Sequence, residues 1–236
     1  MSFSIERMYA IFAKDLKDLS KNMFVLSTAV MPLFFALLFG RGDVVPLEIH
    51  FLVINLTFAT VASFVQGALI AEEKEKNTLR GLMMSPANTA EILIGKSLVS
   101  AGLTVVTLIL CIRMMNFSPA EPVILYGAMV LALIFFLLLG TMLGLLARTL
   151  IEASVIIIPI MFIFGMGNIF TGFFAEYEFL TVLEYLPNFQ LEILAGELAA
   201  GGGWAEAAGA YLIIGAWAAA SCILTVMIYR KKSFET

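Results

Sequence analysis

Charged residues are scarce in this chain, at 14% of its 236 residues, whereas about a quarter of a typical soluble domain is charged. Hydrophobic residues make up 61% of the chain, and its mean hydropathy is +0.99. These values are too apolar for a soluble domain of this length. The composition therefore excludes a soluble globular protein and predicts a polytopic membrane protein.

Cysteine and histidine are scarce as well, and neither forms a cluster. Cys111 and Cys222 fall inside apolar runs, so we interpret them as small hydrophobic residues rather than as a disulfide. His50 stands alone, which favours an interfacial residue over a metal ligand. No Ser-His pattern or paired intramembrane Asp indicates an intramembrane protease, so we expect no catalysis and no metal site.

One short motif could suggest nucleotide binding. Gly95-Lys96-Ser97 resembles the end of a phosphate-binding loop, but Ala90 stands where the first Gly of that loop should be. The residues between them read as helix, whereas such a loop needs exposed backbone amides after a strand. We therefore expect that this chain does not bind ATP by itself.

Six apolar runs each approach the ~20 residues needed to cross a hydrocarbon layer of ~30 Å. Before them, residues 4–21 place apolar side chains at helical spacing and basic ones mostly on the other side, which predicts an amphipathic interfacial helix. The expected fold class is therefore all-α, with six transmembrane helices and an N-terminal interfacial helix. The six runs cover residues 22–40, 51–71, 95–115, 122–146, 153–171 and 208–229.

The basic residues predict the orientation. If the N-terminus is cytoplasmic, all of the 14 Lys and Arg residues except Arg41 and Arg113 fall in cytoplasmic segments, which is the usual bias. We therefore expect a multi-pass plasma-membrane protein with both termini in the cytoplasm. The N-terminus lacks a short apolar core with a cleavage site, so we expect no cleaved signal peptide. We expect no nucleic-acid partner.

The largest outer segment, residues 172–207, contains six Glu residues and no Lys or Arg, yet it is rich in Phe, Leu, Tyr and Ile. We expect short re-entrant helices that dip into the outer leaflet, where their non-helical backbone must be sheltered by protein. Leu186-Pro187 predicts a break between them. The second helix would end at Gly196 or at Gly201-Gly202-Gly203.

Between spans two and three lies an island of charged and turn-forming residues. Asn77 is of the residue type that, after Gly, most readily takes the left-handed conformation that ends a helix. Thr78 then suits the cap of a short helix, Leu79–Met84.

This short helix is bounded on its other side as well. Ser85-Pro86 breaks it, because the proline disfavours helical geometry at the residue before it. Asn88-Thr89-Ala90-Glu91 has the spacing of a capping box that opens the next long helix. Residues 72–90 are therefore predicted to form a cytoplasmic loop with a helix end, a short helix, a turn and a helix start.

The order of these parts resembles the permease subunits of type-2 ATP-binding-cassette (ABC) exporters, over essentially the whole chain. The most specific part of the likeness is Glu72-Glu73-Lys74-Glu75-Lys76-Asn77-Thr78-Leu79, then Ser85-Pro86, Glu91 and Gly95-Lys96. Asn77 stands where this family usually has Gly, and Asn tolerates the same backbone conformation. The resemblance predicts a single transmembrane domain, residues 1–236.

The resemblance implies that Thr78–Met84 is a coupling helix that docks on a separate nucleotide-binding subunit, which holds ATP and magnesium. The turn Leu146–Glu152 would make a smaller second contact. It also implies a second permease, either a copy of this chain or a paralogue, in the lipid bilayer, and no cofactor in this chain. The alternative is a solvated loop with anchoring charges. The coupling residues expected are Glu72, Glu73, Asn77, Thr78, Leu79, Arg80, Leu82, Met83, Ser85, Pro86, Arg148 and Glu152.

Polar residues follow one face of span two and one face of span five, which Pro159 is expected to bend. Amides at membrane depth need hydrogen-bond partners or water, so these faces point at protein or at a passage. By resemblance, both spans face a pathway between two permease copies; the alternative is that the amides only join helices. The candidate path residues are Asn55, Ser63, Gln66, Ser154, Met161 and Asn168.

A small-xxx-small pattern lies in span four, from Gly140 to Gly144. Such a pattern permits two helices to approach closely. We interpret it as a packing site within the chain rather than as a dimerisation site.

Our main functional hypothesis is the permease subunit of an ATP-driven exporter that works by alternating access. The apolar interior favours a hydrophobic or amphipathic substrate, such as a drug, a lipid-like molecule or a peptide. The competing hypothesis is a membrane scaffold or a passive channel with the same six spans, although no selectivity-filter pattern or charged ring is visible.

Overall fold

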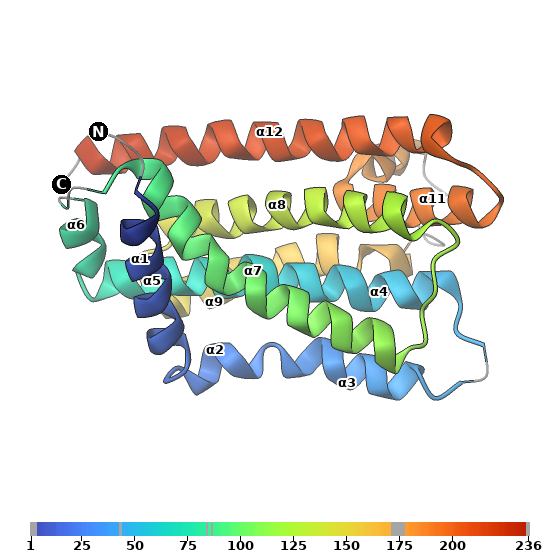
Figure 1. The fold of residues 1–236 in the computed structure, drawn as a ribbon, viewed down its shortest axis with the longest axis horizontal. Helices are drawn as coiled ribbons and strands as arrows, with labels where there is room; N and C mark the ends of the chain where they lie inside the picture. The colour runs from blue at the N-terminus through green and yellow to red at the C-terminus, as the bar shows by residue number, and fades with distance from the viewer. Residues whose placement is uncertain (1–3, 43, 84, 86, 171–177, 235–236) are drawn as a thin grey trace.

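The computed structural model describes residues 4–42, 44–83, 85, 87–170 and 178–234, and all regular structure in these ranges is helical. The all-α prediction is therefore confirmed. Most helices run along the length of the molecule (Figure 1). We call the end that carries α1 and α6 the near end, and the end that carries α11 the far end. The elements are α1 (Ile5–Leu19), α2 (Met23–Ser27), α3 (Val30–Phe39), α4 (Leu47–Thr57), η1 (Phe58–Val65), α5 (Gln66–Glu75), α6 (Thr78–Met83), α7 (Thr89–Met114), α8 (Pro122–Leu146), α9 (Leu150–Ile160), η2 (Met161–Gly165), η3 (Gly167–Phe170), η4 (Glu178–Tyr185), α11 (Pro187–Ala199) and α12 (Trp204–Phe234).

The centre of the bundle is one continuous helix, Leu47–Glu75, made of α4, the π-helical η1 and α5. Its most apolar stretch of 18 residues is wholly buried within the chain. Helices α3, α7, α8, α9 and α11 contact different parts of it. Because neighbours cover it on all sides, this helix needs apolar residues all round rather than in one stripe.

The expected spans are only partly continuous helices. Among the described residues, four helices are long and apolar enough to cross a membrane, or five if the bent pair Ile5–Leu19 and Met23–Phe39 counts as one span. The four are Leu47–Glu75, Ala90–Met114, Pro122–Leu146 and Trp204–Lys231. The first expected span is instead divided into α2 and α3. Pro32 explains this break. It has no backbone N–H to donate to the carbonyl four residues earlier, and its ring clashes with that carbonyl.

The fifth expected span is shorter than the other apolar helices, at Leu150–Gly165. Pro159 lies inside α9, and the chain widens into the π-helical turn η2 directly after Ile160. A proline removes one helical hydrogen bond. The disturbance expected near Pro159 is therefore present, as a π-helical turn that begins two residues after the proline.

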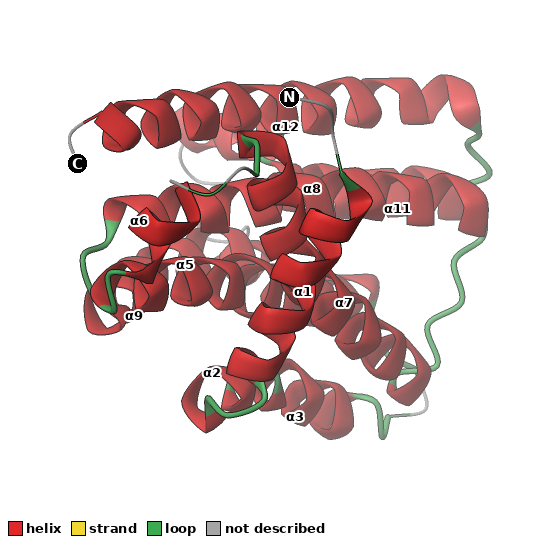
Figure 2. Ribbon diagram, turned by 60° about the vertical axis from the view of Figure 1, so that its left-hand side comes forward, coloured by secondary structure: helices red, strands yellow, loops and turns green. Residues whose placement is uncertain are grey.

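Helix α1 crosses the near end of the bundle (Figure 2). It is bent by 81° from the α2–α3 segment that follows it. Ser4 caps it by accepting from the Arg7 amide. Ile11 and Leu19 are buried, mainly against α7, whereas Ile5 and Tyr9 are 70% and 65% exposed. The amphipathic helix expected for residues 4–21 therefore exists. Some of its apolar residues pack against the rest of the chain, and others are exposed.

Two glycines let α8 touch the central helix. A Cβ atom on Gly140 would lie 2.2 Å from the carbonyl oxygen of Ser63, and one on Gly144 would lie 2.5 Å from that of Gly67. Side chains larger than hydrogen therefore do not fit without moving backbone. The prediction that this pattern packs within the chain is confirmed.

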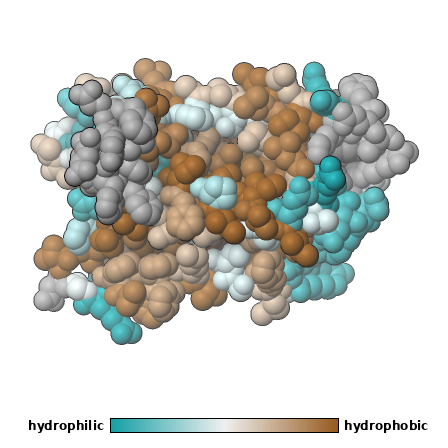
Figure 3. All heavy atoms as spheres, turned by 180° about the vertical axis from the view of Figure 1, so that it is seen from behind, coloured by the Kyte–Doolittle hydropathy of each residue, from teal (hydrophilic) through white to brown (hydrophobic). Residues whose placement is uncertain are grey.

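The outer segment contains η4 and α11, and residues 172–177 of the expected re-entrant region lie outside the described residues. The break expected at Leu186-Pro187 is confirmed, since η4 ends at Tyr185 and α11 begins at Pro187. Helix α11 continues through Gly196 and ends before Gly201, which has a φ of +93°. It packs on α4, α8 and α12 at the far end (Figure 1). Figure 3 shows the opposite face, with hydrophobic residues mainly across the middle and hydrophilic residues gathered at the ends.

Candidate functional site

The short helix α6 is joined to the central helix by a single left-handed residue. Helix α5 ends at Glu75, and Asn77 has a φ of +58°. The Thr78 hydroxyl then donates to the Glu73 carbonyl over 3.2 Å, which fastens the start of α6 to the last turn of α5. The predicted helix end and the predicted short helix are thus both present. Helix α6 is Thr78–Met83, and Met84, its last expected residue, lies outside the described residues.

The other side of α6 also follows the predicted signals. The Ser85 hydroxyl donates to the Leu82 carbonyl over 2.7 Å. Asn88 and Glu91 then form the expected capping box, with each side chain accepting from the other residue's backbone amide. Pro86, the expected breaker, lies outside the described residues.

The last turn of α5 is bonded to several of the elements around it. Glu72 accepts from Asn22 in the turn between α1 and α2, over 2.8 Å. Lys74 donates to the Leu145 carbonyl at the end of α8, over 2.7 Å, and Glu75 accepts from the Leu150 amide at the start of α9, over 2.9 Å. Successive residues of a helix point about 100° apart, so four residues in a row reach different neighbours. We call residues 72–75 the near-end hub.

Two of these contacts also match the helix dipoles. Lys74 places its ammonium at the carbonyl end of α8, where a cation is stabilising, and Glu75 places its carboxylate at the amide end of α9, where an anion is stabilising. The alternation of acid and base in the hub thus complements the neighbouring helix ends.

The fourth hub residue, Glu73, belongs to a buried charge cluster. It pairs with Lys14 of α1 and with Lys96 of α7. Lys96 also lies 3.1 Å from Asp15 of α1, and the side chains of both are 2% exposed. Burial raises the pKa of Asp15, although the Lys96 ammonium opposes that rise. The cluster balances two carboxylates with two ammonium groups and joins α1, α5 and α7.

A second ion pair fastens the start of α1 to the start of α7. The Arg7 guanidinium donates to both carboxylate oxygens of Glu91, over 2.7 and 2.9 Å, and the Ser4 amide donates to the same carboxylate over 2.6 Å. The Glu91 side chain is fully buried. Glu91 therefore caps its own helix, as expected, and it also anchors α1, which the sequence does not reveal.

The structure places the expected coupling residues in different settings. Glu73 is buried in the charge cluster, and the half-buried Glu72 bonds to Asn22 and to the exposed Lys76. Arg148 and Glu152 are exposed in the turn between α8 and α9. There the Arg148 amide donates to the Glu152 carboxylate over 2.7 Å. Asn77 and Thr78 are exposed, and Leu82 and Ser85 are half-buried. The backbone of Leu79, Arg80 and Met83 lies in α6, and their side chains lie outside the described part of the chain.

The three path candidates of span two are enclosed by this chain. Ser63 donates to the Phe136 carbonyl of α8, over 2.8 Å. Gln66 donates to Thr141 of α8 over 3.0 Å and accepts from Ser100 of α7 over 2.9 Å. Both side chains are fully buried. These contacts join helices, which is the alternative that the sequence leaves open.

Asn188 of α11 joins two further path candidates, Asn55 and Asn168. Asn55 of α4 donates to the Asn188 carbonyl over 3.3 Å, and the Asn188 side chain donates to Asn168 over 3.3 Å. All three are buried. Ser154 and Met161, by contrast, are half-buried on α9 and η2, and the Ser154 hydroxyl donates to its own helix at Leu150.

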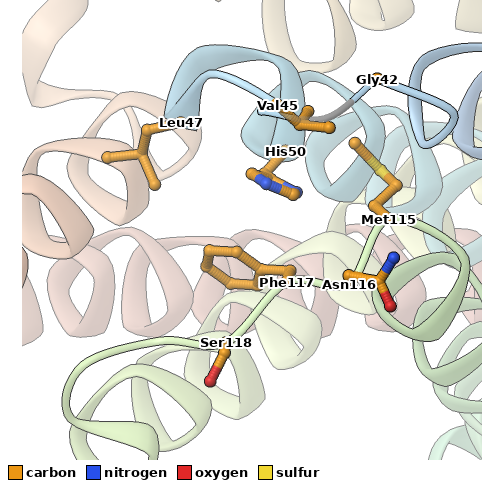
Figure 4. Close-up of a pocket in the computed structure, with 8 residues that line it drawn as sticks. All are labelled: Gly42, Val45, Leu47, His50, Met115, Asn116, Phe117 and Ser118. Carbon is orange, nitrogen blue, oxygen red and sulfur yellow. The ribbon is translucent and has the colours of Figure 1, made fainter.

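A hollow of about 380 Å³ lies at the far end, between the loop before α4 and the loop after α7. Figure 4 shows the residues that line it. His50 and Phe117 face each other there, with ring centroids 4.7 Å apart. His50 is 8% exposed and, among the described residues, its Nδ1 has no hydrogen-bond partner. The residue thus packs the two far-end loops together.

The sequence did not predict which residues pair with the hub glutamates and with the polar residues of the spans. These partners are Lys14, Asp15, Asn22, Lys96 and Asn188. A signal exists for two of them, because Asp15 and Lys96 are charged residues within otherwise apolar helix faces. A charge in such a position is costly unless it is paired, so the two could have been matched to each other.

An all-helical chain with long apolar helices and a charged near end defines a multi-pass membrane protein. Residues 44–227 match the family described as ABC-2 family transporter protein, and this is most of the chain. The chain therefore belongs to the ABC-2 transporter family, as the sequence resemblance predicts. It is a membrane permease of an ABC transporter, a class that works with an ABC ATPase subunit. A comparison with curated proteins found no match.

Proposed function

We propose that this chain is the permease subunit of an ATP-driven exporter, and that α6 is the helix through which the ATPase acts. The observation that carries this proposal is the near-end hub. Helix α6 is separated from the hub only by Lys76 and Asn77, and the hub is bonded to α1, α7, α8 and α9. A displacement of α6 therefore cannot be absorbed by a loose loop.

The expected coupling residues divide into two groups under this proposal. Thr78–Met83, with Ser85, Arg148 and Glu152, forms the surface that docks on the nucleotide-binding subunit, where ATP and magnesium are held. Glu72 and Glu73 act inside the chain, because they are committed to contacts with Asn22, Lys14 and Lys96. They transmit the movement and do not touch the partner.

The pathway lies between two permeases, either two copies of this chain or a copy and a paralogue. The polar stripe of span two is enclosed, so α9 and η2 supply the surface toward the pathway. Ser154 and Met161 lie there beside Val155, Ile158 and Phe162, which are 50–61% exposed. This apolar surface suits a hydrophobic or amphipathic substrate, such as a drug, a lipid-like molecule or a peptide.

The direction of transport is outward across the plasma membrane. The near end faces the cytoplasm under this proposal, because it carries most of the basic residues together with α6 and the C-terminal end of α12. Nucleotide binding closes the ATPase pair, pushes on α6 and moves the near ends of the helices that the hub joins.

The proposal is tested by purifying the tagged chain from its native membrane in mild detergent and identifying the proteins that accompany it. We expect a soluble ABC ATPase with the unmodified chain and its loss from a Leu79→Asp/Leu82→Asp variant. Val44→Asp is the matched control, because Val44 is an exposed apolar residue at the far end. Repeated recovery of the unmodified chain alone would contradict the exporter and favour a scaffold or a passive channel.

A further inference from the structure

Two hollows follow the crevice between α7 and α8. The hollow toward the far end has a volume of about 420 Å³ and is lined by α7 from Val105 to Arg113 and by α8 from Tyr126 to Leu133. The second hollow, toward the near end, has about 270 Å³. Helices α7 and α8 both pack on the central helix, but they contact each other little. The crevice between them exists because α7 otherwise packs on α1 and α3, whereas α8 otherwise packs on α12. Figure 1 shows α7 turning away from α8 toward the far end.

The far-end hollow is an open apolar groove. Leu108, Met129 and Leu133 are buried and form its floor, at 6–9% exposure. Ile109 and Val130, at 54% and 59% exposure, stand on its two sides. A groove with this profile accommodates a flexible hydrocarbon chain, because all of the contacts along it are non-directional.

The length of the groove corresponds to one leaflet. Val105 and Arg113 are eight residues apart on α7, which is about 12 Å along the helix. Half of a hydrocarbon core of ~30 Å is about 15 Å. An acyl chain that begins beside Arg113 and ends beside Val105 therefore spans most of the depth of one leaflet.

The rim of the groove is polar and cationic. Arg113 is exposed at the far end of α7, and among the described residues no carboxylate forms an ion pair with it. Tyr126 lies across from it on α8, in the amphipathic setting that suits Tyr at a membrane interface. The near-end hollow has no Lys or Arg in its lining. Only the far-end groove therefore combines a hydrocarbon slot with a cation.

From this geometry we infer a lipid site: the groove between α7 and α8 binds an acyl chain of a phospholipid with a net negative headgroup, and Arg113 holds the phosphate. The occupant belongs to the leaflet at the far end. The charge of Arg113 selects for anionic over zwitterionic phospholipid, and the apolar groove provides most of the affinity.

Native mass spectrometry of the delipidated chain tests this site, with added phosphatidylglycerol or phosphatidylcholine of identical acyl chains. A cation near an anionic lipid surface is worth about 1 kcal/mol, so we expect an approximately five-fold preference for phosphatidylglycerol. Arg113→Gln should abolish the preference, and Ile109→Trp should weaken binding of both lipids by filling the groove. Arg41→Gln, which removes the other far-end cation, should leave the preference for phosphatidylglycerol unchanged.

Two results would overturn the inference. The first is a preference for phosphatidylglycerol that the Arg113→Gln variant keeps and the Arg41→Gln variant loses. The second is rapid disulfide cross-linking between copies of an Ile109→Cys variant in native membranes, with Cys222 replaced by Ser, because it would show that a second copy covers the groove.

Discussion

Lys96 offers the sharpest test of the buried charge cluster. Its ammonium lies 3.1 Å from Asp15 and also pairs with Glu73, and its side chain is 2% exposed. Lys96→Met removes this charge and retains an unbranched side chain that fills the same space. The variant leaves two buried carboxylates with Lys14 as their only cation in the cluster.

The expected loss of stability follows from the burial. Removing one partner of a buried ion pair costs about 3–5 kcal/mol, because the other charge is left without compensation. In a chain of this length, 1 kcal/mol corresponds to about 2–4 °C in melting temperature. We therefore expect Lys96→Met to lower the melting temperature by roughly 6–20 °C.

The assay is thermal unfolding in mild detergent, followed by the fluorescence of Trp204 and Trp217. Asp15→Asn combined with Lys96→Met should recover part of the loss, because it restores the balance between Lys14 and Glu73. Lys17→Met is the control, since Lys17 is exposed on the same helix as Asp15. A Lys96→Met variant that melts like the control would refute the reasoning.

Three further outcomes follow from the packing and the charges. Gly140→Ala should destabilise the chain by about 1–3 kcal/mol, because the added Cβ would clash with the backbone of Ser63. Gly102→Ala should be neutral or stabilising, because no neighbouring group lies within 4 Å of the added Cβ. Thermal melts of both variants check this. Burial, and next the charge of Glu48, raise the pKa of Glu192 on α11 to about 7, above its ordinary 4.5. Between these two pH values the folded chain keeps a proton on Glu192 that the unfolded chain has lost, so the melting temperature should fall as the pH rises from 4.5 to 7. Glu192→Gln should make the melting temperature less dependent on pH in this range, whereas the exposed control Glu197→Gln should not. Gln66→Leu should lower the melting temperature without affecting recovery of the ATPase, because it removes the contacts with Ser100 and Thr141; altered transport at an unchanged melting temperature would instead favour a pathway role.

The sequence predicts the parts of this fold that depend on local signals. The left-handed turn at Asn77, the capping box at Asn88 and Glu91, and the bounds of α8 all follow from residues within one or two turns of each other. Even the close approach at Gly140 and Gly144 could be expected, because only small residues permit it.

The candidate site depends on contacts that no local pattern contains. The Asp15–Lys96 pair joins residues 81 positions apart, and hydropathy does not distinguish a paired buried charge from a solvated one. For the same reason Glu73 resembles a surface charge in the sequence but is buried in the structure. The enclosure of span two likewise follows from how other helices surround it.

The central claim is that the hub makes α1 move together with the end of α5. Pulsed electron paramagnetic resonance tests it directly, with spin labels at the exposed Lys17 and Lys76 of a chain whose Cys222 is replaced by Ser. The labelled chain is diluted with unlabelled chain and assembled with its ATPase. We expect one narrow distance between the two labels, which ATP does not change and which Lys96→Met broadens. A distance that shifts with ATP in the otherwise unmodified chain would contradict it.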